Sequence, residues 1–285
     1  MAVSLAAEPV AHLGTFPITN SLINAWLALV VIIALGAVIR KSKKAVPRGL
    51  QNAAEAVIEI FLNFIDQVTQ NRAKSKKFLP IVGSLFVFIL LSNLMAQIPG
   101  TGTIGLKEIE HGVPTIIPFL RPATSDLNQT LALSVFAVIA SHIFGIITIG
   151  FFKHANKFIN LGGIWKSFRH GGIAIFTAVI EFMVGLIELV SEAAKILSLS
   201  LRLFGNIFAG EVLLTVLSSL VAFLMPLPFQ FLELIVAVIQ AMVFSMLTLV
   251  YLEIATTSPH GDEEAHEGVS ALAETGEHAV GRAES

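Results

Sequence analysis

Charged and amide side chains line one face of a long apolar stretch of the 285-residue chain, from Glu181 to Glu211. At about 100° per residue on a helix, they fall within an arc of roughly 80°. They are Glu181, Glu188, Glu192, Lys195, Arg202 and Asn206. At 1.5 Å per residue this stripe is about 38 Å long. A charge in the middle of a bilayer costs on the order of 2.5–3.5 kcal/mol on insertion scales, so such side chains face protein or water. The stripe therefore predicts a path along which ions move.

Arg202 can act in two ways within this stripe. As a structural group it would form an ion pair with a carboxylate on its own helix or on the next one. Lys195 is a nearer partner for the acids of the stripe, however, and an apolar pair would pack at lower cost than a buried salt bridge. Because arginine keeps its proton even when it is buried, a fixed positive charge is suited to making a passing carboxyl group release its ion. We expect this second role, with the structural ion pair as the alternative.

The composition of the chain indicates that this stripe lies within a membrane. The sequence is 55% hydrophobic and only 13% charged, which is typical of an integral membrane protein. It contains no cysteine, which excludes disulfides and thiolate metal sites. No nucleophile–base grouping, phosphate-binding loop or metal-binding cluster stands out, and no basic surface points to nucleic acid. Residues 1–20 do not resemble a cleaved signal peptide.

The pattern of apolar residues predicts an all-α polytopic membrane protein. Five apolar segments are long enough to cross a bilayer, and they cover residues 20–39, 78–98, 129–152, 173–224 and 230–255. Residues 48–72 have a helical period but too much charge to span, so we expect a helix on the membrane surface. As one helix, residues 173–224 would be about 75 Å long against a hydrocarbon core of about 30 Å. This segment must therefore be broken or steeply tilted, and Gly205 and Gly210 permit either.

The distribution of basic residues predicts the orientation. Fourteen of the 18 Lys and Arg fall in the proposed inner loops and tail, whereas Lys107 and Arg121 fall in the outer segments. By the positive-inside rule, the amino end lies outside and the carboxyl end lies in the cytoplasm. We expect an external segment over residues 1–19, a single membrane domain over residues 20–255, and a disordered acidic tail over residues 256–285.

Four segments of the chain carry a family resemblance. They read SNLMAQIPG from Ser92, SDLNQTLAL from Ser125, LSLRLFGNIFAGE from Leu199, and IQAMVFSMLTLVYL in the last helix. Together they resemble subunit a of F-type ATP synthases, the stator of the membrane-embedded FO sector, over nearly the whole chain. The resemblance implies a long tilted helical hairpin packed against a ring of c subunits. It also implies two offset aqueous half-channels separated by Arg202, with ion flow coupled to ring rotation and ATP synthesis. The chain would then be no enzyme on its own, because ATP chemistry occurs on other subunits.

The resemblance also implies which side chains line the two half-channels. Asn206, Glu211, Glu233 and Gln240 match positions of the outer half-channel. Glu188, Ser191 and Lys195 match positions of the inner half-channel. Many bacterial relatives have a histidine at the position of Glu233. If two glutamates face one another here, they would share a proton and titrate as a coupled pair.

Weaker candidates are Asp126, Glu192 and His142. Asp126 could line the entrance of the outer channel or cap a helix, and His142 could relay protons or simply pack against a neighbouring helix. The implied partners are the c ring, the b subunits of the peripheral stalk, and lipid. The helix over residues 48–72 would rest on that lipid or dock the stalk. The implied cargo is H⁺, with Na⁺ as the alternative, and no cofactor, metal or organic substrate is implied. The implied location is a bacterial plasma membrane, or alternatively an organelle inner membrane.

Two other functions stay open from the sequence. A secondary transporter would use Arg202 to bind an anionic solute, and this function predicts a repeat between the two halves of the chain. No such repeat is visible. A membrane scaffold would carry these charges for structural reasons alone, so that neutralising Arg202 and Glu192 together would leave ion flux intact.

Overall fold

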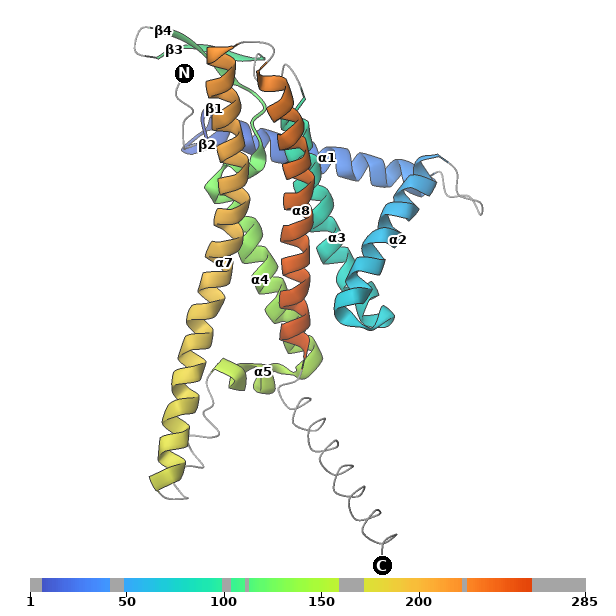
Figure 1. Cartoon of the computed structure of the whole chain (residues 1–285), viewed down its shortest axis with the longest axis vertical. Coiled ribbons are helices and arrows are strands. Elements are labelled where there is room, and N and C mark those ends of the chain that lie inside the picture. The colour runs from blue at the N-terminus through green and yellow to red at the C-terminus, as the bar shows by residue number, and fades with distance from the viewer. Residues whose placement is uncertain are drawn as a thin grey trace, which may run out of the picture. The chain divides into compact units, whose positions relative to one another are not determined.

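The computed structural model describes residues 7–41, 49–98, 104–110, 113–158, 172–221 and 225–257. Five helices within these ranges are long and apolar enough to cross a membrane (Figure 1). They are α1 (Asn20–Lys41), α3 (Arg72–Ala96), α4 (Leu127–Ile149), α7 (Gly172–Leu220) and α8 (Pro226–Thr256). The predicted all-α polytopic fold is thereby confirmed. The predicted tail lies outside the described residues beyond position 257.

The described residues belong to two compact units. The first lies within Met1–Ile139 and Ile187–Val250, and the second within Ala140–Leu186 and Tyr251–Ser285. In the first unit, apolar side chains are buried on α2 (Leu50–Thr69), α3, α7 and α8. They include Phe61, Ile65, Phe78, Val82, Ile89, Leu199, Leu203, Ile207 and Phe244. The second unit buries Leu252 and Ala255 of α8.

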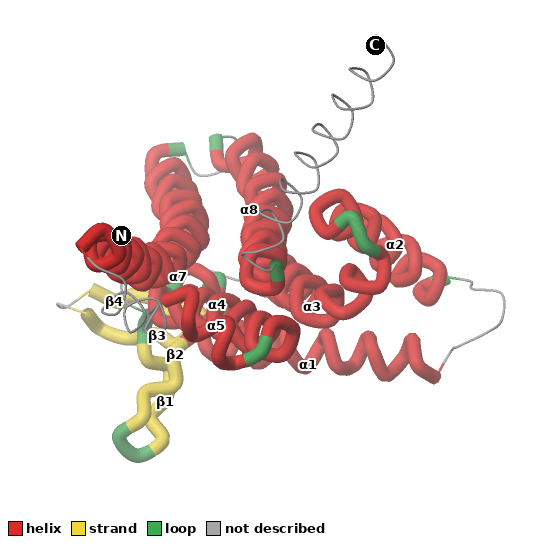
Figure 2. The backbone as a smooth tube through the Cα atoms, turned by 90° about the horizontal axis from the view of Figure 1, so that it is seen from below, coloured by secondary structure: helices red, strands yellow, loops and turns green. Residues whose placement is uncertain are grey.

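Two short β-hairpins lie in segments that the sequence places outside the membrane without predicting strands. β1 (Pro9–Leu13) pairs antiparallel with β2 (Phe16–Thr19), and β3 (Gly105–Glu110) pairs antiparallel with β4 (Val113–Pro118). Figure 2 draws both in yellow. The first hairpin turns at Gly14, whose φ of 67° is a conformation that glycine adopts without strain. Each strand has only four to six residues. An alternation of apolar and polar residues over so short a stretch is difficult to recognise in the sequence.

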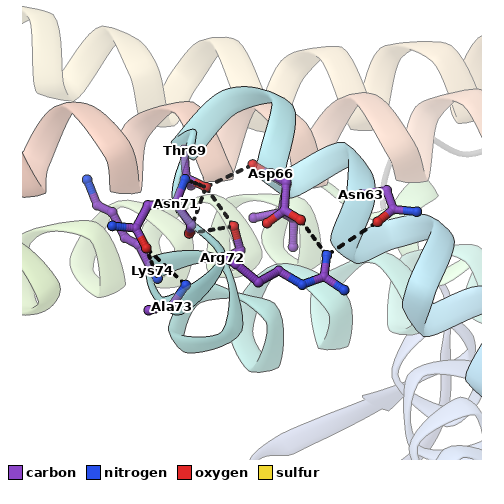
Figure 3. Close-up of polar contacts among 9 residues, drawn as sticks. Asn63, Asp66, Thr69, Asn71, Arg72, Ala73 and Lys74 are labelled. Carbon is purple, nitrogen blue, oxygen red and sulfur yellow. Dashed lines mark hydrogen bonds and ion pairs between the residues drawn. The ribbon is translucent and has the colours of Figure 1, made fainter.

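The end of α2 and the start of α3 differ from the predicted helix bounds, which were 48–72 and 78–98. α2 ends at Thr69, and α3 already begins at Arg72. The reason is a helix cap: the Asn71 side chain accepts hydrogen bonds from the backbone N–H groups of Ala73 (2.9 Å) and Lys74 (3.3 Å). Figure 3 shows this cap, together with Arg72 turned back toward Asp66 of α2. Arg72, Lys74, Lys76 and Lys77 therefore lie in the first turns of α3.

The third predicted span, residues 129–152, begins and ends earlier in the structure, as α4 (Leu127–Ile149). α4 ends at Ile149, and the short helix α5 (Phe151–Phe158) follows directly. Gly150 separates the two helices with a φ of 96°, which a residue with a side chain rarely adopts. The residues around Lys153 therefore belong to a separate helix.

α7 is one unbroken helix of 49 residues, about 74 Å long at 1.5 Å per residue. The sequence left two alternatives for this segment, a break or a steep tilt. Since neither Gly205 nor Gly210 interrupts the helix, the tilt is the alternative that remains for a hydrocarbon core of about 30 Å.

Candidate ion-translocation site

Arg202 lies on an exposed face of α7. The neighbouring residues Leu199, Leu203 and Ile207 are almost completely buried, with exposed fractions of 0–1%, and they anchor α7 in the first unit. Among the residues that the structure describes, Arg202 makes no hydrogen bond or ion pair. A permanent cation on the surface of an apolar helix is thus available to a group outside this chain.

The part of the stripe that precedes Arg202 carries an ion pair of its own. Lys195 Nζ donates to Glu192 Oε1 at 2.7 Å, one helical turn apart on α7. Lys195 is therefore a partner for an acid of the stripe, as the sequence suggested. Glu188 is half-buried and Ser191 is exposed on the same helix. The assignment of Glu188, Ser191 and Lys195 to an inner half-channel stays a prediction, and Glu192 stays a weaker candidate.

On both sides of Arg202 along α7, polar side chains join this helix to its neighbours. Asn206 Nδ2 donates to Oε1 of Gln240 on α8 at 2.7 Å, and Gln240 is only 4% exposed. The hydroxyls of Thr130 on α4 and Ser200 on α7 lie 3.2 Å apart. Buried polar groups must find partners, so these contacts fix both the spacing and the rotation of the helices beside Arg202.

Glu211 binds an arginine that the sequence did not single out. Arg121 Nε donates to both carboxylate oxygens of Glu211, at 2.9 and 3.1 Å. The Arg121 side chain is 5% exposed and that of Glu211 is 22% exposed. The hydroxyl of Ser125 is a further polar neighbour of this carboxylate. Arg121 was counted from the sequence as one of two basic residues in the outer segments, but its guanidinium is buried against α7.

Glu233 is the other glutamate that the family resemblance assigns to the outer half-channel, and its surroundings differ from those of Glu211. It is 6% exposed on α8 and packs directly against Gly210 of α7. A Cβ atom at position 210 would lie only 2.6 Å from Glu233 Oε1. Gln97 is a polar neighbour, and Glu233 Oε2 has no hydrogen-bond partner among the described residues. The two glutamates are therefore not equivalent, since only Glu211 has an arginine partner in the described structure.

The segment that carries Arg121 is held on two sides. Asn24 Nδ2 of α1 donates to the backbone carbonyls of Arg121 (2.9 Å) and Ser92 (3.1 Å). Thr124, in the 3₁₀ turn η2 (Ala123–Ser125), donates to Asn93 of α3. Both amide side chains are buried, so they tie the turn to two membrane helices.

Asp126 follows this turn and caps α4. Its Oδ1 accepts a hydrogen bond from the N–H of Asn128, and its Oδ2 accepts one from the Ser21 hydroxyl, both at 2.9 Å. Helix capping, one of its two predicted roles, is therefore observed, whereas the role at a channel entrance stays a prediction.

His142 belongs to the second unit. Its Nδ1 lies 3.2 Å from Nε2 of His154 on α5, and His154 is 6% exposed. Gly145 makes room for this pair, since a Cβ there would lie 2.7 Å from the His154 ring and from the carbonyl of Ala255. The contact supports a packed histidine, and the proton relay stays a prediction.

The family model for the ATP synthase A chain matches residues 22–253, which include every candidate residue above. The chain belongs to the ATP synthase A chain family. The ATP synthase subunit a of Moorella thermoacetica is 30% identical over 85% of this chain and 92% of its own length. Those of Geobacter sulfurreducens and Syntrophobacter fumaroxidans are 32% and 30% identical, over 82% and 89% of this chain and 86% and 91% of their own lengths.

As a member of the ATP synthase A chain family, the protein is a multi-pass membrane subunit of the FO sector and has its partners there. This membership fits a role without catalytic chemistry of its own. The residue that reasoning from sequence missed is Arg121. One signal was available, because Arg121 stands alone between Leu120 and Pro122 with no other charge until Asp126.

Proposed function

We propose that the chain is the ion-translocating stator subunit of an F-type ATP synthase and that Arg202 faces the carboxyl groups of a rotating c ring. The guanidinium favours the ionised form of each arriving carboxyl group, which therefore gives up its ion. It also blocks a direct leak between the two half-channels, because a fixed positive charge repels a cation in a medium of low dielectric constant.

One observation carries this proposal: Arg202 is exposed on an apolar helix without a partner among the described residues. A buried structural ion pair would need such a partner, because an unpaired charge within a folded core is strongly destabilising. Lys195 and Glu192 are instead paired with each other. The charge of Arg202 is therefore available to a carboxylate supplied by another subunit.

The remaining assignments complete the proposal. Asn206, Glu211, Glu233 and Gln240 line the outer half-channel. Glu188, Ser191 and Lys195 line the inner one, with Glu192 beside them. The transported ion is H⁺, with Na⁺ as the alternative. The subunit contacts the b subunits of the peripheral stalk, uses no cofactor, and lies in a bacterial plasma membrane with its amino end outside. A membrane potential supplies about 2.3 kcal/mol per charge for every 100 mV.

The proposal is tested by Arg202→Ala in the assembled enzyme reconstituted into liposomes. ATP-driven proton uptake and gradient-driven ATP synthesis should both fall by at least about a hundredfold, a loss typical of removing a preorganised charge. Arg202→Lys should also be severely impaired, because a lysine can lose its proton on burial. Lys41→Ala, which removes an exposed cation at the end of α1, is the control. Normal coupled activity in Arg202→Ala would refute the proposed function.

A further inference from the structure

We propose that Arg121 holds Glu211 as a permanent anion, so that Glu233 is the outer carboxyl group that takes up and releases the transported proton. This inference rests on the proposed function, since it assigns separate tasks to two residues of the outer half-channel. Arg121 is then a positioning residue, because its guanidinium influences proton transfer only by way of Glu211.

The contact between Arg121 and Glu211 commits both groups to their charged forms. The guanidinium stays protonated at any accessible pH, and its side chain is 5% exposed. A buried cation requires a counter-ion, and removing one partner of such a pair leaves an uncompensated charge. With both carboxylate oxygens receiving hydrogen bonds from Arg121, Glu211 is that counter-ion. Protonating Glu211 would therefore break a pair that the fold has already assembled.

The backbone from which the Arg121 side chain extends is held in place by two buried contacts. The carbonyl of Arg121 is held by Asn24 of α1, and Thr124 is held by Asn93 of α3. These anchors are buried, so the backbone that carries Arg121 cannot move away without leaving buried polar groups unpaired. Arg121 therefore provides a stationary charge beside Glu211.

Glu233 has the opposite surroundings. Its polar and charged neighbours are Gln97 and Glu211, and no cation forms an ion pair with it among the described residues. Because Glu233 Oε2 is buried without a hydrogen-bond partner, the site accommodates a neutral carboxylic acid better than an unpaired anion. Glu8 of the amino-terminal segment is a further acidic group near Glu211.

The resulting step is a simple proton transfer. The O–H bond of protonated Glu233 breaks, and the proton forms an O–H bond with the carboxylate presented by the c ring. Water in the outer half-channel then supplies the next proton to Glu233. Glu211 and Arg121 keep their charges throughout.

The test measures ATP-driven proton uptake by liposomes that contain the assembled enzyme. Arg121→Gln leaves a buried carboxylate without its partner, and uptake should fall by at least about tenfold. The double variant Arg121→Gln/Glu211→Gln removes both charges and should recover most of that loss, as coupled residues do. Glu233→Gln should abolish uptake. Lys107→Gln removes the other basic residue of the outer segments and should leave uptake unchanged.

Infrared difference spectra provide a second measurement that does not depend on Arg121→Gln assembling. The difference between spectra recorded at low and at high external pH should contain the carbonyl band of a protonated carboxyl group. This band should disappear in Glu233→Gln and persist in Glu211→Gln. The reverse pattern, or a double variant as inactive as Arg121→Gln alone, would overturn the inference. Arg202→Ala separates the two proposals, because normal uptake in that variant refutes the proposed function, whatever the Arg121 variants do.

Discussion

Gly210 determines where the carboxyl group of Glu233 can lie, because its missing side chain leaves the space that Glu233 fills. In Gly210→Ala the new Cβ would meet Glu233 Oε1 at 2.6 Å. That atom is the end of a flexible side chain, so it can move aside, and alanine in a helix interior is favoured over glycine by about 1 kcal/mol. We therefore expect an assembled enzyme of normal stability whose proton uptake is reduced about tenfold, since small misplacements of reacting groups are costly.

Gly205→Ala is the matched control for this prediction. It makes the same substitution in the same helix, five residues away, where a Cβ has nothing within 4 Å. Its rate of proton uptake and its melting temperature are compared with those of Gly210→Ala in the reconstituted enzyme. Equal rates in the two variants would mean that the contact with Gly210 does not position Glu233.

The two arginines differ in how far the sequence could predict their surroundings. Helical spacing alone placed Arg202 on the polar stripe and Lys195 near the acids, because these relations are local. The pairing of Arg121 with Glu211 joins residues that are 90 positions apart. No periodicity reports such a contact, and it depends on how the turn at Arg121 is anchored to α1 and α3. The family signature found Glu211, but only the fold revealed its partner.

At the scale of elements, the α2–α3 turn is held by a small charged network outside the predicted spans. Arg72 donates to Asp66 and, at 3.3 Å, to Asn63 (Figure 3). The Ser75 side chain, by hydrogen bonding, and then the Arg72 guanidinium lower the pKa of Asp66 below its ordinary 3.8, against the opposing effect of burial. The ionised carboxylate therefore stabilises this turn.

The stability of this turn should depend on pH in a defined direction. Because the pKa of folded Asp66 is lowered, its contribution is complete above pH 3.8 and is lost as the pH falls from 3.8 through the folded pKa. We expect Asp66→Asn to lower the melting temperature at neutral pH by less than about 2 °C, since exposed ion pairs contribute little. The difference from the wild type should vanish in acid. Asn63→Ala removes a hydrogen bond but no titrating group, and its effect should not change with pH.

Element boundaries were the least predictable part of the fold. The five spans followed from apolar length, but α3 began six residues earlier than the predicted Phe78 because Asn71 caps it. α4 ended at Ile149 because Gly150 takes a positive φ. Such boundaries depend on single residues whose backbone conformation no hydrophobic pattern reports. The two hairpins were missed for the same reason, since each depends on a turn and on a few paired residues.

At the scale of the whole molecule, length sets the main constraint. α7 is about 74 Å long if every residue rises 1.5 Å, and a hydrocarbon core is about 30 Å thick. An unbroken helix of this length can keep its apolar surface in lipid only if it is inclined. The stripe that carries Arg202 then crosses the bilayer obliquely, which suits the proposed contact with a rotating ring. The sequence leaves a break and a tilt as alternatives, and the unbroken α7 decides between them.

The orientation of the molecule is the last prediction, and the absence of cysteine makes it directly testable. Thr15 is exposed in the turn of the first hairpin, and Gln67 is exposed on α2, so α1 separates the two positions. The excess of basic residues on the inner side predicts that Thr15→Cys reacts with a membrane-impermeant thiol reagent applied to intact cells. Gln67→Cys should react only in inside-out vesicles, and the unsubstituted chain reports the background. Labelling of Gln67→Cys in intact cells would reverse the assignment. The proposed outer and inner half-channels would then exchange sides, and the proposed uptake of protons by Glu233 would be from the cytoplasm.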